Sequence, residues 1–358
     1  MKAVVLVGGE GTRLRPLTLT TPKQMLPIVG VPMIERVLGD LARHGVDEAV
    51  LSLGYLPDAF LNAYPDGVAA GVRLTYAVEP EPLDTAGAVR FAAKFAGIDE
   101  TFVVVNGDVM TDLDLTALVE FHRSHGAEGT IALHPVADPS AFGVVPTDGQ
   151  GKVTAFVEKP PRDEAPTNEI NAGTYVLEPS VLTRIPEGRR VSIERETFPA
   201  LVRDGVLFAR ADDSYWLDTG TPAAYLEANF DYIRGRRRVE TVAPGLRAEG
   251  HVWVEGPSDQ LGAVVGPAVV FAECVIEPGA RVERSILGRG IVVSSGAVVT
   301  DSVLMDGCHV AADASVAGSV MGPRSIVGQR ADVRAVSVLG ADAVVSSGTL
   351  VDGERVAG

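Results

Sequence analysis

Residues 2–16 read KAVVLVGGEGTRLRP, an apolar stretch that runs directly into a glycine-rich turn with two arginines. The five residues 3–7 are Val-rich and end at glycine, which is typical of a buried strand. The turn is not the dinucleotide fingerprint, because the third glycine of that pattern would fall at Leu14, and it lacks the Gly-Lys-Ser/Thr of Walker A. It predicts a backbone nest in which the amides of Gly8, Gly9 and Gly11 converge on phosphate oxygens.

Short aliphatic runs alternate with helical patterns through roughly the first 230 residues. Four runs read as buried strands: Ala3–Val7, Glu48–Leu53, Arg73–Val78 and Thr101–Val105. Three stretches have helical spacing: Pro32–His44, Thr85–Lys94 and Leu115–Ser124. This alternation predicts an α/β fold with a mostly parallel sheet and helices on both faces. Ligands bind at the carboxyl ends of such strands, where the glycine-rich turn and Asn106–Asp108 both fall.

The helical periodicity ends after Arg234, where RGRRRVETVAPGLRAEG reads as a linker at the end of a helix. Aliphatic residues then recur every six positions, with a slip to four at 282→286 and 316→320, and Asp332 breaks the third run. The positions are Val264, Val270, Ile276, Val282; Ile286, Val292, Val298, Leu304, Val310, Val316; Val320, Ile326, Val338, Val344 and Leu350. One aliphatic residue per hexad is expected to point inward, with three hexads to a coil of a parallel β-helix.

A coarser repeat, Ser–(Ile/Val)–(Leu/Met), begins at Ser285, Ser302, Ser319 and Ser337, which are almost evenly spaced at about one coil each. The two cysteines, Cys274 and Cys308, are separated by twice the interval from Ser285 to Ser302, which predicts equivalent inward positions two coils apart as small hydrophobes. Two cysteines make no disulfide framework or zinc cluster, and this favours a reduced, cytoplasmic setting.

Charge and hydropathy exclude several classes of partner. Lys and Arg number 31 against 47 Asp and Glu, a net charge of −16, which disfavours nucleic acid and anionic membranes. No stretch approaches the roughly 18 apolar residues of a membrane span. The apolar run at residues 3–7 is too short for a signal peptide.

Arg13 and Arg15 add positive charge to the first turn, and Pro22-Lys23-Gln24 follows on a stiff, proline-bounded segment that suits a fixed phosphate contact. Together, GGEGTRLRPLT and PKQMLPIVGVPM resemble the sugar-1-phosphate nucleotidylyltransferases, or NDP-sugar pyrophosphorylases. The resemblance continues through LDTAGA at 83–88, NGD at 106–108, FGV at 142–144, FVEKP at 156–160, NAG at 171–173 and YWLDTG at 215–220. It implies a Rossmann-like nucleotidyltransferase domain at 1–234, a linker at 235–262 and a left-handed parallel β-helix at 263–358.

The resemblance also implies site residues. Those for the nucleotide are Leu6, Gly8, Gly9, Gly11, Thr12, Arg13, Lys23, Gln24, Thr85, Gly87 and Asp108. Those for the sugar phosphate are Gly143, Glu158, Lys159, Asn171 and Asp218. Arg13, Lys23, Asp108 and Asp218 are the implied catalytic residues, and the two aspartates are the implied Mg²⁺ ligands, which suits a hard cation that shares phosphate oxygens.

The implied reaction is in-line attack of a sugar 1-phosphate oxygen on the α-phosphorus of a nucleoside triphosphate, with pyrophosphate leaving. Arg13 would stabilise the leaving pyrophosphate, Lys23 the triphosphate and Lys159 the nucleophile. No general base is needed, because the attacking phosphate is already ionised.

The pairing of these motifs with a hexad-repeat tail most resembles bacterial mannose-1-phosphate guanylyltransferases, which favours GTP and mannose 1-phosphate. Two details depart from that pattern. Gln24 completes a PKQ shared with thymidylyltransferases, and Asp84 replaces a glycine common in relatives. Transfer from dTTP, UTP or ATP to glucose 1-phosphate, or to an unusual sugar or cyclitol phosphate, therefore stays open. Asp84 could select a substrate or serve as an exposed helix cap.

Two other classes of protein share parts of this plan. Regulatory subunits of the translation exchange factor have the same two domains but commonly lose catalytic residues, whereas Arg13, Lys23, Asp108, Lys159 and Asp218 are all present here. Acyltransferases with a β-helix need a general base, and His309, the single histidine within the repeats, reads better as an outward-facing structural residue. The β-helix is expected to cover exposed surface and to join subunits into a homodimer or homotetramer.

Overall fold

The computed structural model describes residues 1–237, 242–256 and 263–358. Residues 238–241 and 257–262, part of the predicted linker, lie outside the described residues. The chain packs into two compact units, one of Met1–Gly9 with Ile34–Trp216 and one of Glu10–Met33 with Leu217–Gly358. The second unit thus combines a short N-terminal segment with the C-terminal part. The boundaries expected at 234 and 262 remain a prediction.

The first unit is built on a ten-stranded sheet with the order β11-β10-β12-β7-β1-β4-β6-β5, in which β9 pairs with both β12 and β13. Its strands are β1 (Lys2–Leu6), β4 (Glu48–Leu53), β5 (Val68–Ala69), β6 (Val72–Val78), β7 (Phe102–Asn106), β9 (Gly129–Pro135), β10 (Gly143–Val144), β11 (Val157–Glu158), β12 (Glu169–Leu177) and β13 (Leu207–Ala211). β1 runs parallel to β4 and β7, and β4 to β6. β12 runs antiparallel to β7 and β9. The predicted mixed, mostly parallel sheet is confirmed.

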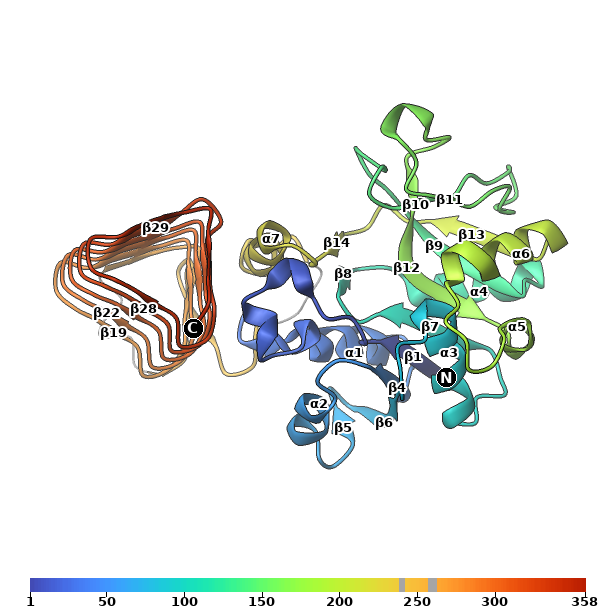
Figure 1. Ribbon diagram of the computed structural model, residues 1–358, viewed down its shortest axis with the longest axis horizontal. Coiled ribbons are helices and arrows are strands. Elements are labelled where there is room, and N and C mark those ends of the chain that lie inside the picture. Colours follow the sequence, from blue (N-terminus) through green and yellow to red (C-terminus); the bar gives the residue numbers. More distant parts are fainter. Residues whose placement is uncertain (238–241, 257–262) are drawn as a thin grey trace. The chain divides into compact units, whose positions relative to one another are not determined.

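Helices of the first unit pack on this sheet (Figure 1). They are α1 (Met33–Arg43), α2 (Asp58–Ala63), α3 (Asp84–Phe95), α4 (Leu115–His125), α5 (Pro179–Arg184) and α6 (Phe198–Asp204). α4 shows how local sequence sets the ends: the Asp114 carboxylate accepts a hydrogen bond from Ala117 N, and Gly126 ends the helix in the left-handed conformation. The three predicted helices correspond to α1, α3 and α4.

The N-terminal segment of the second unit consists of short turns and a hairpin. These are η1 (Thr12–Leu14), η2 (Leu17–Leu19), η3 (Lys23–Met25), β2 (Pro27–Ile28) and β3 (Val31–Pro32). Helix α7 (Pro222–Ile233) holds the hairpin through Asn229, which is fully buried and accepts a hydrogen bond from Val29 N at 2.8 Å. The hydroxyl of Tyr225 donates to the carbonyl of Pro27. Buried polar side chains thereby fix the segment to α7.

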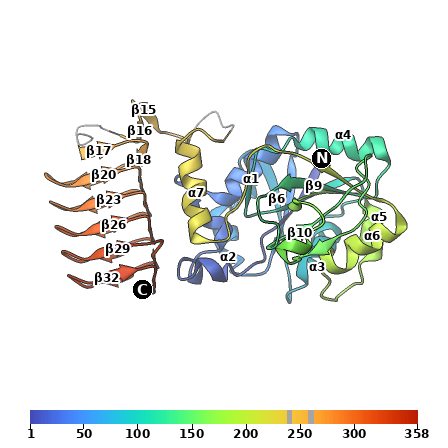
Figure 2. The ribbon, with the colours of Figure 1, turned by 90° about the horizontal axis from the view of Figure 1, so that it is seen from above.

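The rest of the second unit is a three-sided solenoid of stacked coils (Figures 1 and 2). One face has eight strands: β15 (Arg247–Glu249), β16 (Val252–Val254), β18 (Ala268–Val270), β21 (Ile286–Leu287), β24 (Val303–Leu304), β27 (Val320–Met321), β30 (Val338–Leu339) and β33 (Arg355–Val356). The second has six: β17 (Val264–Val265), β20 (Arg281–Glu283), β23 (Val298–Thr300), β26 (Ser315–Ala317), β29 (Asp332–Arg334) and β32 (Leu350–Asp352). The third has five: β19 (Val275–Ile276), β22 (Val292–Val293), β25 (His309–Val310), β28 (Ile326–Val327) and β31 (Val344–Val345). The predicted parallel β-helix is confirmed, and its sheet already includes β15 and β16 within the predicted linker.

The predicted phase of the repeat is wrong by one residue at eight positions. The solenoid core contains Leu287, Val293, Val299, Met321, Val327, Leu339, Val345 and Val351, each one residue after the expected inward position. Val344, for example, is 61% exposed whereas Val345 is 3% exposed. The cause is the coil length: a step of five, as from Val299 to Leu304, interrupts the steps of six, so a strict sixfold frame drifts out of phase. Asp332 breaks nothing, because its neighbour Val333 is the inward residue.

The other repeat predictions are confirmed. Successive coils pair at offsets of 17, as in Val292 with His309, and 18, as in Val320 with Val338. Cys308 is fully buried in the core and Cys274 packs against it. Burial raises the pKa of each thiol to about 11, as expected of small hydrophobes rather than reactive groups.

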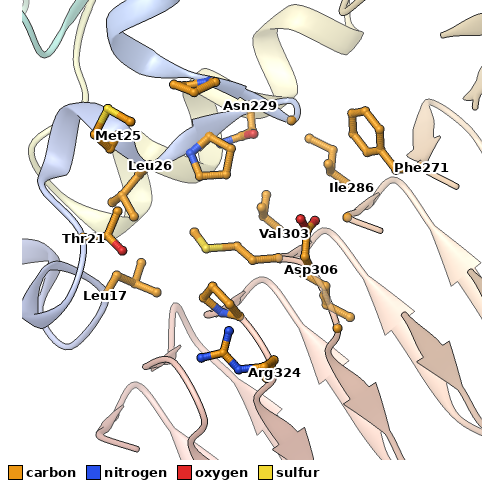
Figure 3. A pocket seen from close by; sticks show the side chains of 18 residues that line it. Leu17, Thr21, Met25, Leu26, Asn229, Phe271, Ile286, Val303, Asp306 and Arg324 are labelled. Atoms are coloured by element: carbon orange, nitrogen blue, oxygen red, sulfur yellow. The ribbon is translucent and has the colours of Figure 1, made fainter. Parts of the chain in front are cut away.

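Within the second unit, the N-terminal segment lies against the eight-stranded face of the solenoid (Figure 3). The ring of Phe271 occupies the space that a side chain at Gly30 would need. A Cβ at Gly340 would lie 3.1 Å from the ring of Pro16, and Arg355 Nη1 donates to the carbonyl of Arg15 at 3.4 Å.

A cavity of about 520 Å³ remains between the segment and this face, lined by apolar side chains such as Leu17, Met25 and Val303. Its polar side chains are already paired: Arg324 with Asp342 at 2.7 Å, and Asp306 with the amide of Arg289 at 2.8 Å. Separately, no helix among the described residues is long and apolar enough to cross a membrane.

Candidate active site

In the first unit, the carboxyl ends of β1 and β7 meet. Gly107 N donates to the carbonyl of Leu6 at 3.0 Å, and this places Asp108 in the turn between β7 and β8 (Val109–Thr111). A Cβ at Gly107 would lie 2.6 Å from the side chain of Val7, so the close approach requires glycine. Asp108 therefore lies at the edge where ligands of parallel sheets bind.

Tyr175 of β12 is the centre of the acidic part of this edge. Asn171 Nδ2 donates to its hydroxyl at 2.9 Å. Burial raises the pKa of Tyr175 above its usual range, and the nearby carboxylates of Glu194, Glu158 and Asp108 raise it further. The phenol is therefore a fixed neutral acceptor that orients Asn171. Asn171 thus contacts the buried Tyr175 directly, and three carboxylates lie near enough to act on the pKa of its hydroxyl.

The sugar motif lies on the antiparallel pair β10–β11, where Gly143 is opposite Glu158. A Cβ at Gly143 would lie 2.6 Å from the ring of Phe156, so any larger residue at this position would displace the ring. Lys159 follows with φ +50°, a left-handed conformation that is costly for a residue with a side chain. Its ammonium lies 3.4 Å from Glu158 Oε1 and is 59% exposed. The lysine is therefore accessible to an anionic ligand.

The NAG stretch forms an irregularity in β12, where the register with β9 shifts between Asn171 and Tyr175. Gly173 takes φ +75° and donates its amide to Asn171 Oδ1 at 3.0 Å. A Cβ there would lie 2.6 Å from Asn106 Nδ2. Trp216, in the YWLDTG motif, donates from Nε1 to the carbonyl of Ala172 at 2.9 Å. This hydrogen bond stabilises the irregularity in β12. The irregularity aims Asn171 at Tyr175.

The predicted nucleobase loop is held by a second network. Thr85 Oγ1 donates to Glu194 Oε2 and accepts from Ile193 N, both at 2.8 Å. At Gly87 a Cβ would lie 2.9 Å from the carbonyl of Arg189, so the loop after α5 packs directly on the start of α3.

Glu79 lies beside the first glycine of the opening turn. A Cβ at Gly8 would lie 3.5 Å from Glu79 Oε1, and Gly9 has open space around it. The Glu79 carboxylate accepts from Ser52 Oγ and from Leu83 N, each at 3.0 Å. This half-buried acid was not anticipated from the sequence.

In the second unit, the remaining predicted residues gather around Gly11, which takes φ +61° just before η1. Thr18 Oγ1 donates to the carbonyl of Gly11 at 2.8 Å and stabilises this turn. Arg13 Nη2 lies 3.9 Å from Asp218 Oδ2, and the arginine is 63% exposed. Asp218 Oδ1 accepts from Gly220 N at 2.8 Å. A Cβ at Gly220 would collide with the Arg13 guanidinium.

Lys23 and Gln24 lie in η3, and both are buried, at 8% and 3% exposure. A Cβ at Gly11 would lie 3.1 Å from the Lys23 Cβ, so the lysine is next to the glycine turn. The buried Gln24 Oε1 has no hydrogen-bond partner among the described residues. A buried acceptor left without a partner is costly, which suits a residue that meets a ligand.

Two further residues are now explained. Glu10 Oε2 pairs with Arg15 Nη2 at 2.7 Å, so the charge that Arg15 was expected to bring to the phosphate nest is largely matched by that carboxylate. Asp84 takes φ +61° and its Oδ1 accepts from Thr85 N at 2.8 Å. Asp84 is exposed and is the first residue of α3, whose N-cap is Leu83 without a side-chain cap hydrogen bond, so its carboxylate bonds the next amide and does not cap the helix.

The donor set fits Mg²⁺. Asp108, in the turn between β7 and β8 of the first unit, and Asp218, beside Arg13 in the second unit, each supply hard carboxylate oxygens. Among the described residues no three His, Cys, Asp or Glu side chains cluster as a metal site. Mg²⁺ takes one or two protein carboxylates and completes its shell with water and phosphate oxygens, so each of these aspartates has the chemistry of a ligand for it.

Comparisons with known proteins agree with this arrangement. The model of the family described as nucleotidyl transferase matches residues 2–235. The chain belongs to the nucleotidyl transferase family. The GMPPB C-terminal domain model matches residues 264–358 of this nucleotidyl transferase. A mannose-1-phosphate guanylyltransferase of Mycobacterium tuberculosis is 44% identical over 272 residues, covering 75% of this chain and 72% of that protein. A mannose-1-phosphate guanyltransferase of Aspergillus oryzae is 42% identical over 273 residues, 73% of each chain.

Among solved structures, HddC from Yersinia pseudotuberculosis is similar with a TM-score of 0.56 and 30% identity, over 64% of this nucleotidyl transferase and 99% of HddC. The same protein has been solved in complex with GMP-PN. The predictions of family, fold class and enzymatic nucleotidyl transfer are therefore confirmed.

Sequence reasoning missed Glu79, Tyr175 and Glu194, although each lies within a few residues of a motif it did use or contacts one. Glu79 precedes LDTAGA, Tyr175 follows NAG at the same bulge, and Glu194 contacts Thr85. Side chains alternate between the two faces along β12, which places Tyr175 on the same face as Asn171. This alternation could have identified Tyr175 as a site residue from the sequence.

Proposed function

We propose that this enzyme transfers GMP from GTP to mannose 1-phosphate, giving GDP-mannose and pyrophosphate. Relatives at 42–44% identity carry that activity in their names, and the similar HddC has been solved with a guanine nucleotide analogue. The observation that carries the choice of GTP is the Glu79 carboxylate beside Gly8.

Glu79 suits guanine because of hydrogen-bond polarity. Guanine presents two adjacent donors, N1–H and the N2 amino group, which a carboxylate accepts together. Uracil and thymine present one N–H between two carbonyl oxygens, and these would be repelled by the acid. Adenine presents an amino group beside an acceptor nitrogen. A carboxylate at this position therefore favours guanine over the other three bases.

The reaction needs two anions to approach. An oxygen of the sugar phosphate forms a bond to the α-phosphorus of GTP, and the bond from the α-phosphorus to the bridging oxygen breaks, so that pyrophosphate leaves with its electron pair. Lys159 holds the sugar phosphate, and Glu158 and Asn171 accept and donate hydrogen bonds to the sugar hydroxyls. Lys23 and the glycine turn hold the triphosphate, and Arg13 neutralises the leaving pyrophosphate.

Asp108 and Asp218 would hold Mg²⁺. When bound, the cation supplies charge neutralisation at phosphate oxygens. The chain's own contribution is positioning: Asp218 is fixed by Gly220 N, and Asp108 by the Gly107 turn against Leu6. No proton needs to be removed from the nucleophile, so the mechanism assigns no general base.

The test measures pyrophosphate release for GTP, UTP, dTTP, ATP and CTP, each with mannose 1-phosphate and glucose 1-phosphate. GTP with mannose 1-phosphate is expected to give the highest kcat/KM. In Glu79→Gln, kcat/KM for GTP should fall roughly 10–100-fold, because the variant loses a charge-assisted hydrogen bond that contributes about 1.5–3 kcal/mol. The control Ser52→Ala removes a hydroxyl from the same carboxylate and should keep the preference. Equal use of dTTP or UTP by the wild type would overturn the assignment of the nucleotide.

A further inference from the structure

A cavity of about 610 Å³ lies in the first unit, between the exposed face of α3 and the loop that follows α5. Its walls include Leu83, Arg90, Phe91, Lys94, Phe95 and Arg189. Cavities of roughly 300–1,000 Å³ are the size of small-molecule sites. Leu83 and Gly87 of the predicted nucleobase loop line it, whereas the carboxylates Asp108 and Glu158 and the glycines of the opening turn do not, so it borders the candidate active site at that loop.

Three cations on its walls are only partly neutralised. Arg90 Nη2 pairs with Glu187, whose side chain is 82% exposed, while Arg90 Nε is buried without a hydrogen-bond partner among the described residues. Lys94 is exposed and makes no ion pair within the described parts of the chain. Arg189 lies 3.8 Å from Glu196, a long and exposed pair. Two acids, Glu81 and Glu187, line the cavity as well, so its walls carry one net positive charge, which stands out in a chain of net charge −16 and favours an anionic ligand.

The cavity also offers aromatic rings. Phe91 and Phe95 lie one helical turn apart, with ring centroids 6.3 Å apart, and Phe95 is 60% exposed. A phenyl ring left this open is a ready surface for the flat face of a base or the apolar face of a sugar ring.

We infer that this cavity binds a phosphorylated metabolite that carries a ring, a nucleoside phosphate or a sugar phosphate. Arg90, Lys94 and Arg189 hold the phosphate, because guanidinium and ammonium groups pair with its oxygens by charge-assisted hydrogen bonds. Phe91 and Phe95 hold the ring. The apolar contact distinguishes this ligand from inorganic phosphate.

The cavity is joined by hydrogen bonds to the predicted nucleobase loop. Val191 N donates to the carbonyl of Leu83 at 3.0 Å, and Val191 O accepts from Ala86 N at 2.9 Å and from Gly87 N at 3.2 Å. A ligand that bridges α3 and Arg189 holds this strand of chain against the loop. Its binding is therefore coupled to nucleotide binding, and the coupling, though not the site, rests on the proposed function.

The binding test is hydrogen exchange measured with millimolar GMP, mannose 6-phosphate or inorganic phosphate. GMP or mannose 6-phosphate should slow exchange in residues 90–95 and 186–191, and the stronger of the two identifies the ring. The protection should be lost in Lys94→Ala/Arg189→Ala and kept in the control Arg123→Ala/Arg203→Ala, which removes the same charge from exposed sites on α4 and α6. Because the first pair leaves the candidate active site intact, occupancy there cannot account for the difference.

Three results would overturn the site: protection by no probe, equal protection by inorganic phosphate, or protection that persists in Lys94→Ala/Arg189→Ala. If protection of residues 90–95 and 186–191 increases with protein concentration and does not depend on the probe, this face instead contacts a second copy of the chain. Steady-state kinetics provide a second test. The sugar phosphate or nucleotide that protects the cavity should lower the KM for GTP at least fivefold in the wild type but not in Lys94→Ala/Arg189→Ala. A wild type that is inactive with GTP contradicts the proposed function and leaves the exchange result to decide the site.

Discussion

Lys159 combines a strained backbone with an exposed ammonium, so its two roles can be separated by mutation. Lys159→Gly and Lys159→Ala should both lower kcat/KM roughly 10²–10³-fold, since each removes the charge that holds the sugar phosphate. Glycine relieves the positive φ, so Lys159→Gly should be about 1–2 kcal/mol more stable than Lys159→Ala. Urea unfolding and pyrophosphate release measure the two effects. Equal stability of the two variants would contradict the strain, and retained activity would contradict the phosphate contact.

Asp218 is the residue at which charge and geometry can be tested apart. Asp218→Asn keeps an oxygen for Gly220 N, so the fold should be retained, while the negative charge facing Arg13 and the proposed cation is lost. We expect kcat to fall by two or more orders of magnitude, the usual effect of losing a group that acts on transition-state charge. The matched control is Asp213→Asn, an exposed aspartate nearby in sequence, which should behave as wild type. Near-wild-type kcat in Asp218→Asn would remove Asp218 from the machinery.

At the scale of the element, a ladder of buried serines links successive coils of the solenoid. Ser285, Ser302 and Ser319 are fully buried, and each hydroxyl donates to a carbonyl of its own coil. The hydroxyls of Ser285 and Ser302 also accept the amide of the next serine in the ladder, at 3.2 and 3.1 Å. The serine therefore satisfies backbone groups at a corner where the strand ladder cannot.

Ser302→Ala leaves Ser319 N and the carbonyl of Thr300 without this partner. The free energy of unfolding of the solenoid should fall by about 1–3 kcal/mol, the cost of buried unpaired polar groups. The control is Ser295→Ala, whose hydroxyl bonds Pro278 O at an exposed corner and should cost less than about 0.5 kcal/mol. Chemical denaturation followed by circular dichroism gives both numbers. Equal effects would mean that the ladder carries no more stability than a surface hydroxyl.

Sequence patterns predicted the elements better than their phase. The strands and helices of the sheet follow from local periodicity, and so does the existence of the coil. The inward residues do not, because Val292 and Val293 are both valine and only the shorter step within a coil decides which one is buried. The strand pattern placed Asn106–Asp108 correctly at the carboxyl end of β7. It could not supply Glu79 or the Glu10–Arg15 pair, because those depend on which side chains meet after folding.

At the scale of the whole molecule, the second unit joins the N-terminal segment, which we propose binds the triphosphate, to the solenoid through the contact of Phe271 with Gly30. Phe271→Ala should loosen residues 17–32 and raise the KM for GTP about tenfold. It should leave the KM for mannose 1-phosphate unchanged, since four of the five predicted sugar-phosphate residues belong to the first unit and the fifth, Asp218, lies outside the loosened segment. Hydrogen exchange of residues 17–32 should quicken in parallel. Phe271→Leu should keep a KM for GTP close to that of the wild type, because leucine fills most of the space of the phenyl ring.

The control for this prediction is Val344→Ala, on the five-stranded face of the solenoid, where the side chain is 61% exposed. It should change neither KM. A parallel rise of both KM values in Phe271→Ala would indicate general loss of structure, and no rise would show that the contact does not position the segment.

The contacts of this segment also set an order of events during synthesis. A ribosome makes Pro16 and Gly30 long before their partners, which are Phe271 for Gly30 and Gly340 for Pro16. The sheet can fold as soon as its strands have left the exit tunnel, in line with N-terminal parts folding first. The N-terminal segment, which we propose holds the triphosphate, therefore gains these contacts only after the coils have formed. A nascent chain stalled before Phe271 should leave residues 17–32 without their contact to the solenoid.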